Sequence, residues 1–373
     1  MLATEHPHQW NVHFDRLTPY QHEAIALRFD SPQLLAGLPG SGLTTVASFR
    51  LAALLQAGPR LKRPRPTYVA ASLLRARRMH YLLGPLAVDI DIVTVSQWLM
   101  MLYSRATGQE KPDGADIDWV RVAGEIRAAG RPLVASVVVD DAHRIRPEQR
   151  LAARMLTENV YFTSHAPNHT AIEQQIGLPA SLMLGRRRRQ PRDLLQAATA
   201  WGATAPGAAT DGNRRPAALE AAPGKTGAVL LEVMARRRAE RSLRVAVVPM
   251  ARDQVSKIAD FFLVKGVSRR LLFSGDAPFN QVRRWDVGVP GIYVLNPEQL
   301  EGLEFDEVYV IGTQHVGEDT ASAAVQGKLM AIVNSCCSRL VLSWPEGTPA
   351  RPALVRKLDE AGIFSARQGF SGA

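Results

Sequence analysis

A glycine-rich segment near the N-terminus constrains most strongly how this 373-residue chain can fold. The apolar run 33–36 leads into the sequence Gly37-Leu38-Pro39-Gly40-Ser41-Gly42-Leu43-Thr44, and residues 44–56 then carry apolar side chains at helical spacing. A strand, a glycine-rich turn and a helix in this order let backbone N–H groups close around a phosphate at the helix N-terminus. The segment therefore predicts an α/β unit with a phosphate-binding loop after a strand.

One position of this loop departs from the pattern G-x-x-x-x-G-K-[ST], because Leu43 stands where the pattern has lysine. Leucine carries no charge and donates no hydrogen bond, and a lost charged contact costs about 1.5–3 kcal/mol. Thr44 keeps the hydroxyl that binds Mg²⁺ in such loops. We therefore expect ATP with Mg²⁺ to bind only weakly. The expected nucleotide contacts in the loop are Gly37, Gly40, Ser41, Gly42, Leu43, Thr44 and Thr45.

Two acidic residues follow a second constraining feature, the continuous β-branched run 133–139. Such a run suits a strand buried on both faces of a parallel sheet. Asp140 and Asp141 at its end fit a Walker B pair, in which the first acid binds Mg²⁺ with Thr44 and the second orients the attacking water. The usual second acid is a glutamate, so Asp141 has a shorter reach. An N-cap role for these acids is the alternative.

Alternating strand and helix patterns extend over most of the chain and favour an α/β fold with mainly parallel sheets. The length suits two domains, which we place at 1–178 and 179–373, with an irregular stretch rich in Ala, Gly and Pro at 201–225. The expected strands cover 67–71, 91–95, 133–139, 244–249, 292–295, 307–311 and 339–343, and the expected helices include 44–56, 73–83, 253–264 and 328–333.

The composition narrows the classes of partner. Lys and Arg number 45 against 35 Asp and Glu, a net charge of +10, which favours an anionic partner such as nucleic acid. A solvated basic surface is the alternative. The only cysteines, Cys336 and Cys337, are adjacent and predict no disulfide framework. Without a signal-peptide pattern or an apolar stretch of about 20 residues, we expect a cytoplasmic location and no membrane partner.

The order of these motifs resembles the UvrD/Rep family of superfamily 1 helicases. In the first half, the sequence LTPYQ at 17–21 resembles the Q motif, AASLLRARRM at 70–79 motif Ia, TVSQW at 94–98 motif Ib, and VDDAHRIRPEQ at 139–149 motif II. In the second half, 184–199 resembles motif IV, 294–306 motif V with an intact GLEFD tail, and 330–343 motif VI. This ordered series covers most of the chain.

The resemblance implies two RecA-like domains and assigns roles to several residues. Gln21 would contact adenine, Glu304 would lie on the nucleotide side, and Arg189 would reach the γ-phosphate beside the catalytic acids Asp140 and Asp141. It also implies a single-strand track along Ser72, Arg75, Arg77, Arg78 and Thr94. The arginines 186–188 directly precede Arg189, and the alternative to a nucleic-acid contact for them is a solvated helix face. Trp98 either stacks on a base or belongs to the core.

Further departures from the family pattern concern charge and length. Glu298 and Glu301 replace the histidine and lysine of motif V, and Ser335 replaces the arginine of motif VI. Motif III is poorly kept in 163–169, where Asn168 or His169 could replace its glutamine. The spans 97–137 and 279–292 are too short for the large accessory insertions of the family. Weak or absent ATP hydrolysis and no processive unwinding are therefore expected.

The leading hypothesis is a degenerate helicase-like protein that binds DNA or nucleotide as a non-unwinding scaffold or regulatory subunit. Single-stranded or junction DNA and a protein are its expected partners. One alternative is an active DNA-dependent ATPase or helicase that uses a substitute cation such as Arg50 or Arg16 for the missing lysine. The other alternative is a protein-interaction module that binds neither ligand.

Overall fold

The computed structural model describes residues 13–38, 40–57, 65–110, 112, 117–130, 136–165, 169–185, 192–202, 218–300, 302–320, 322–363 and 365–366. The chain divides into two compact units, Met1–Arg187 and Arg188–Ala373. This division lies beyond the predicted boundary at 178, because β6 (Ala180–Leu184) pairs in parallel with β1 (Gln33–Gly37) and so completes the first sheet. Each unit is an α/β body built on a parallel sheet, as predicted.

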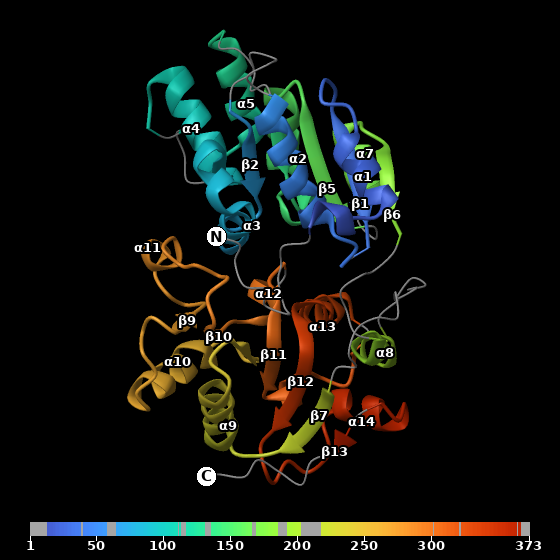
Figure 1. Cartoon of the computed structure of the whole chain (residues 1–373), viewed down its shortest axis with the longest axis vertical. Helices are drawn as coiled ribbons and strands as arrows, with labels where there is room; N and C mark the ends of the chain where they lie inside the picture. Colours follow the sequence, from blue (N-terminus) through green and yellow to red (C-terminus); the bar gives the residue numbers. More distant parts are fainter. Residues whose placement is uncertain are drawn as a thin grey trace. The chain divides into compact units, whose positions relative to one another are not determined.

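The first unit is built around a six-stranded sheet with the order β3-β2-β4-β5-β1-β6 (Figure 1). Its other strands are β2 (Thr67–Ala70), β3 (Asp91–Thr94), β4 (Val137–Val139) and β5 (Val160–His165). Its helices are α1 (Pro19–Ala26), α2 (Leu43–Ala57), α3 (Leu73–Leu83), α4 (Val95–Thr107), α5 (Trp119–Ala128), α6 (Pro147–Leu156) and α7 (His169–Ile176). Short 3-10 turns cover Phe14–Arg16, Gly84–Asp89 and Ala142–Arg144.

Successive strand residues of this sheet face opposite sides and build two separate cores. Leu34 and Val69 pack in one apolar cluster with residues of α4 to α7. Their neighbours Leu35 and Tyr68 pack in the other cluster with residues of α1 to α3. This alternation explains the continuous apolar runs, because a parallel strand covered on both faces needs apolar side chains at every position. The carboxyl ends of the strands remain available for polar groups.

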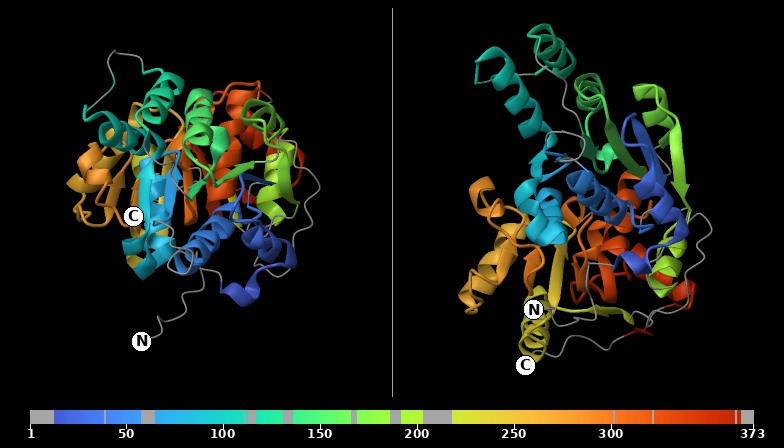
Figure 2. Two further views of the ribbon diagram at one scale, coloured as in Figure 1. Left: turned by 90° about the horizontal axis from the view of Figure 1, so that it is seen from above. Right: turned by 45° about the horizontal axis from the view of Figure 1, so that its top comes forward.

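Two helices fill the span between β3 and β4, where the sequence left room for only a small insertion. α4 and α5 lie side by side in every view (Figures 1 and 2). Trp98 of α4 is 2 % exposed and packs with Trp119 of α5 in the apolar core. Trp98 is therefore a core residue, because a buried indole in the core cannot stack on a base.

The second unit has a seven-stranded sheet with the order β13-β7-β12-β11-β8-β10-β9. The strands are β7 (Ala218–Pro223), β8 (Arg244–Pro249), β9 (Leu272–Ser274), β10 (Gly291–Val294), β11 (Phe305–Ile311), β12 (Cys336–Trp344) and β13 (Ser365–Ala366). The helices are α8 (Arg192–Ala200), α9 (Thr226–Ala239), α10 (Gln254–Val264), α11 (Phe279–Val282), α12 (Pro297–Leu300), α13 (Ala323–Ser335) and α14 (Ala353–Glu360). A 3-10 turn covers Thr313–His315.

Part of the stretch 201–225, which was expected to be irregular, forms a strand. β7 pairs in parallel with β12 over its whole length, from Ala218 to Pro223. The composition concealed it, because alanine and proline have low strand propensity and only the pairing partner stabilises the extended backbone. Residues 203–217 lie outside the described part of the chain. Among the described helices, none is long and apolar enough to cross a membrane.

Candidate functional site

The glycine-rich loop between β1 and α2 is held by the residue predicted to contact adenine. Thr18 and Gln21 form a capping box at the start of α1, and the Gln21 Nε2–H group donates to the carbonyl oxygen of Ser41 at 2.9 Å. Gly42 has φ +97°, and a Cβ atom built there would lie 2.3 Å from Gln21 Nε2. The left-handed backbone therefore favours glycine at this position, and a side chain there would also displace the Gln21 amide.

Leu43, the residue in place of the loop lysine, belongs to the hydrophobic core. Its side chain is 5 % exposed and packs in the cluster that includes Leu35, Val46 and Leu184. A Cβ atom built on Gly37 would lie 3.1 Å from Leu43 Cδ2, so the side chain turns back towards β1. The replacement thus removes a charge from the loop and adds apolar contact to the core. Beside it, Thr44 stays partly exposed and Thr45 is buried.

The first acid of the predicted pair, Asp140, is 1 % exposed and accepts hydrogen bonds at both carboxylate oxygens. The Tyr68 hydroxyl donates to Oδ2 at 2.8 Å, and the Thr163 hydroxyl donates to Oδ1. The same Thr163 oxygen accepts the backbone N–H of Asp141 at 2.9 Å. Burial, followed by the charge of Asp140, raises the pKa of Tyr68 well above its usual value, so Tyr68 remains a donor.

The second acid, Asp141, has its own internal counter-ion. It is the one non-glycine residue with positive φ, at 55°, within the described ranges. The carboxylate forms an ion pair with Arg75 from α3, a side chain that is itself only 6 % exposed. Burial lowers the pKa of Arg75, and the charge of Asp140 counteracts that effect. A guanidinium group has such a high pKa that it stays charged here, so Asp141 is already neutralised.

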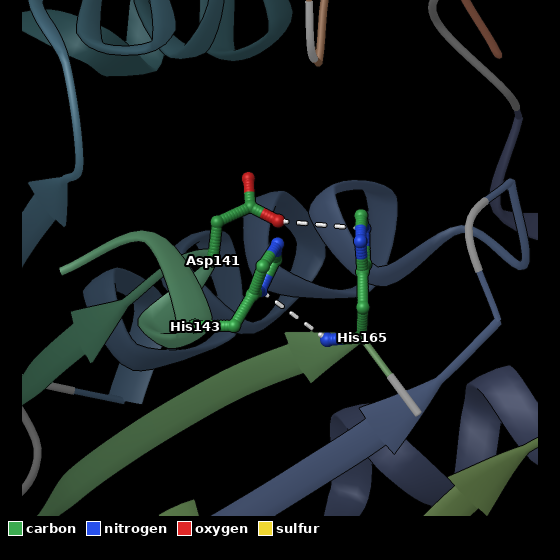
Figure 3. A group of neighbouring side chains, drawn as sticks. All are labelled: Asp141, His143 and His165. Carbon is green, nitrogen blue, oxygen red and sulfur yellow. Dashed lines mark hydrogen bonds and ion pairs between the residues drawn. The ribbon is translucent and has the colours of Figure 1, made fainter. Parts of the chain in front are cut away.

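Two histidines complete this cluster at the ends of β4 and β5 (Figure 3). The rings of His143 and His165 stack with centroids 4.1 Å apart, and His165 Nε2 lies 3.7 Å from Asp141 Oδ1. The His165 backbone N–H donates to His143 Nδ1 at 3.3 Å. Burial, assisted by the charges of Arg75 and Arg144, lowers the pKa of His143 to about 3. His143 is therefore neutral near pH 7 and carries its proton on Nε2.

Three of these side chains carry atoms that could bind a metal ion. One donor atom each from Asp141, His143 and His165 lie within 4.8 Å of one another, and two imidazoles with one carboxylate suit a transition metal better than Mg²⁺. However, the tautomer of His143 leaves no lone pair on Nε2, and Asp141 is paired with Arg75. Asp140 accepts one hydrogen bond at each oxygen and keeps a further lone pair on each. The residues do not fit the Mg²⁺ ion expected from the Walker B pattern, because the buried Arg75 guanidinium already supplies the positive charge beside Asp141.

The residues of the predicted single-strand track lie at two helix starts and on α3, and their role towards nucleic acid stays a prediction. Ser72 and Thr94 are N-caps of α3 and α4 and accept from the backbone N–H groups of Arg75 and Gln97. Arg75 and Arg78 are buried, and Arg78 lies close enough to lower the pKa of Tyr68. The helical spacing of α3 turns both arginines inwards. Within this predicted set, Ser72 is exposed and Arg77 partly exposed.

Arg50, one proposed substitute cation, has a structural role. Its guanidinium donates to the carbonyl oxygens of Ile25, Leu27 and Arg28 at and just beyond the end of α1. It also lies between the rings of Phe29 and Tyr161, at 4.3 and 4.1 Å. Burial lowers its pKa to about 10, which keeps it charged at neutral pH. With these contacts made, Arg50 does not stand in for the loop lysine, whereas Arg16 is exposed.

In the second unit, the residues that replace family cations have local partners. Glu298 forms an ion pair with Lys328 of α13 at 3.5 Å, which offsets the reversed charge of motif V. Ser335 is buried at the end of α13, and its hydroxyl donates to the Ile332 carbonyl. Glu304 is partly buried. Arg189, Glu301 and Asn168 lie outside the described residues, so their predicted roles stay predictions.

Sequence reasoning missed three members of the first-unit site: Tyr68, Thr163 and His165. Tyr68 lies in β2 and the other two in β5, the two strands that flank β4 and the acid pair. Thr163 and His165 fall in the span examined for motif III, which was the one available signal. A tyrosine in a buried strand gives no sign of its partner until the strand order is known.

Comparison with solved structures relates the fold to helicases. Dbp5 of S. cerevisiae bound to RNA and ADP with BeF3 matches 96% of this chain and 91% of that chain, with a TM-score of 0.55 and 10% identity. A variant of Dbp5 in the same complex gives a TM-score of 0.56 and 9% identity, over 94% of this chain and 90% of that chain. The DUF1998 helicase MrfA bound to DNA matches 95% of this chain and 49% of that chain, with a TM-score of 0.50 and 13% identity.

No protein-family model and no curated protein matches the sequence. At identities this low, the structural likeness shows the fold alone. The chain therefore has a helicase-like fold of two RecA-like units. Dbp5 and MrfA do not distinguish the UvrD/Rep family from other helicases.

Proposed function

We propose that this protein is a degenerate UvrD-like superfamily 1 helicase-like protein, which binds nucleic acid and nucleotide without hydrolysing ATP or unwinding duplexes. The observation that carries the proposal is the ion pair between Arg75 and Asp141. In an active site of this type the second acid orients the attacking water. Here its carboxylate is occupied by a buried guanidinium group, so it is not available for that role.

The loss of cations supports the same conclusion. Leu43 is packed in the core, and Ser335 stands at the motif VI position as a buried hydroxyl. An arginine that stabilises the transferring phosphoryl group contributes about 10³–10⁵ in rate. With that arginine and the loop lysine both replaced, the chain has lost two of the cations that stabilise the transferring phosphoryl group.

Weak nucleotide binding remains compatible with the loop. Gly40 and Gly42 keep the left-handed backbone of a phosphate cradle. The Ser41 Oγ atom is buried and has no hydrogen-bond partner in the described part of the chain, so it is free to bind a ligand oxygen. Because Arg75 and Arg78 lie near the acids where Mg²⁺ would bring its charge, nucleotide binding should not depend on Mg²⁺.

The proposed nucleic-acid partner is single-stranded or junction DNA. The net charge of +10 favours a polyanion, and the structural neighbours are bound to RNA and to DNA. A scaffold or regulatory role also implies a protein partner, and we propose one here.

Nucleotide binding and hydrolysis test the proposal directly. We expect no DNA-stimulated ATP hydrolysis above background and equal affinity for a fluorescent ATP analogue with Mg²⁺ or with EDTA. Gly42→Val should abolish the nucleotide binding that the loop provides, since a side chain there would strain the left-handed backbone and press on Gln21, whereas Arg283→Gln, an exposed position in the second unit, should not. Robust turnover that Asp140→Ala removes would instead establish the active ATPase alternative.

DNA binding is tested by its salt dependence. Binding of a single-stranded oligonucleotide should weaken steeply between about 50 and 200 mM salt, because each contacted phosphate releases counterions. A flat salt response would rule out backbone contacts. If neither DNA nor nucleotide raises the melting temperature, the protein-interaction alternative is favoured, since a ligand of the native state must stabilise it.

A further inference from the structure

The second unit contains a cavity that the proposed function does not use. It has a volume of about 500 Å³, within the range of small-ligand sites. The carboxyl end of α9 and the segment after α10 supply most of its lining. Met234, Val267 and Ile292 form apolar parts of the wall, and Arg237, Arg238 and Arg241 form charged parts.

The charge of these three arginines is not balanced locally. None of them forms an ion pair with another residue in the described ranges, in contrast to Arg236 one position before them. The Arg237 Nε atom is buried without a hydrogen-bond partner among the described residues, and Nη1 makes only a 3.4 Å contact with the Glu240 carbonyl. The cavity therefore combines apolar walls with guanidinium groups that lack an anion.

Its place in the sheet separates it from the family motifs. Ile292 lies at the beginning of β10, and Arg241 lies shortly before β8 begins at Arg244. The cavity is thus at the amino ends of these parallel strands. Motif V follows the carboxyl end of β10, where ligands of open α/β sheets normally bind. A ligand in this cavity would occupy a second, independent site.

We propose that this cavity binds a nucleotide phosphate together with its base. Guanidinium groups bind phosphate through paired N–H donors and also stack on flat rings. The apolar wall suits the base, and the unpaired arginines suit the phosphate. A free nucleotide and the phosphorylated 5′ end of a strand share this chemistry, so both are tested.

The test uses isothermal titration calorimetry on the full chain with AMP, adenosine and inorganic phosphate. AMP should bind more tightly than the other two, and R237Q/R241Q should weaken it by about tenfold or more, because two charge-assisted contacts are lost. The double variant R283Q/R284Q removes the same charge at exposed positions outside the cavity and should leave AMP binding unchanged. R237K/R241K keeps the charge but loses the paired donors, and should give an intermediate loss.

Two further experiments distinguish this cavity from the glycine-rich loop, and a free nucleotide from a strand end. Gly42→Val disables the loop of the first unit and should leave AMP binding intact, whereas loss of binding in this variant would assign AMP to the loop. Oligonucleotides with a 5′ phosphate or a 5′ hydroxyl distinguish a strand end from a free nucleotide. Equal weakening by both double variants, or phosphate binding as tightly as AMP, would overturn the proposal.

Discussion

Both units bury charged side chains, but they do so in different places. In the first unit, Asp140 and Asp141 lie after the last residue of β4, and Arg75 reaches them from α3. In the second unit, the charged side chains project from the strands themselves, with Glu307 of β11 paired to Arg339 of β12.

The second-unit network is closed. Arg339 pairs with Glu220 and Glu232 at 2.9 Å and with Glu307 at 3.4 Å, while Arg236 of α9 binds Glu307 from the other side. Burial alone would lower the pKa of Arg339, but hydrogen bonds to the glutamates and nearby negative charge raise it overall. This network joins β7, β11, β12 and α9, and we infer that it has a structural role, which we call the framework role.

The first-unit cluster around Asp140 and Asp141 differs from this network because it lies at the ends of strands. It includes two stacked histidines and a left-handed Asp141, and such backbone conformations of non-glycine residues cluster at functional sites because the surroundings must enforce them. Burial of charge alone therefore does not indicate a functional site. Acids at the strand ends, on a backbone that the surroundings enforce, do indicate one, even where an internal arginine has neutralised the acids.

The largest expected effect comes from Arg339→Met. Removing this side chain takes one cationic partner from Glu220, Glu232 and Glu307 at once, although Glu307 keeps its pair with Arg236. Breaking a buried ion pair from one side costs about 3–5 kcal/mol. We expect a loss near the top of that range in urea unfolding followed by circular dichroism. Arg351→Met is the control, since Arg351 and Asp359 form an exposed pair that contributes at most about 1 kcal/mol. Equal losses in both variants would contradict the framework role.

Arg75→Ala should have the next largest effect and a different signature. The loss of the counter-ion to Asp141 should cost about 3 kcal/mol, and Mg²⁺ should restore part of it by binding the freed acids. The melting temperature of the variant should therefore rise with millimolar Mg²⁺, while that of the wild type should not change. A wild-type protein that Mg²⁺ stabilises equally would show that Arg75 does not replace the ion.

Leu43→Lys tests whether the loop can regain its cation. Because Leu43 is buried, the substitution removes about 1.5–3 kcal/mol of apolar burial, and hydrolysis should not return while Arg75 holds Asp141. Leu43→Met keeps the volume and should cost less than about 1.5 kcal/mol. Chemical denaturation and an ATPase assay measure the two outcomes. Turnover by Leu43→Lys alone would show that the lysine is the only missing part.

The smallest effect concerns His143 and pH. Its pKa is about 3 in the folded chain and about 6.5 when unfolded, so only the unfolded chain takes up a proton between these values. Stability should therefore fall as pH drops below about 6.5, by at most about 1.4 kcal/mol per pH unit from this group. His143→Gln should show a shallower slope between pH 7 and 5 in urea unfolding. Identical slopes would mean that His143 is not buried in its neutral form.

Local patterns predicted much of the fold. The helix expected at 73–83 and the strand expected at 244–249 have the observed bounds of α3 and β8, since helical spacing and β-branched runs are properties of neighbouring residues. β7 escaped prediction because its alanines and proline have low strand propensity and only pairing with a distant strand stabilises it. β5 was not predicted although Val160, Tyr161 and Phe162 favour a strand.

The candidate site was predictable in part. Asp140, Asp141 and the exceptional Leu43 are visible from motif spacing, but the direction of each side chain is not. That Leu43 turns into the core and that Arg75 turns towards Asp141 depends on how α2 and α3 pack on the sheet. The Arg339 network has no sequence signal, because its members lie far apart in the chain.

The Gln21 side chain couples local opening of α1 to local opening of the glycine-rich loop. Its Oε1 accepts from the Thr18 backbone N–H while its Nε2 binds the Ser41 carbonyl, so the start of α1 and the glycine-rich loop share one amide group. Fraying of α1 would release the loop in the same event. Hydrogen exchange of the Thr18 amide should therefore follow the motion of the loop, and a ligand held in the loop should slow exchange at a helix end that it never touches.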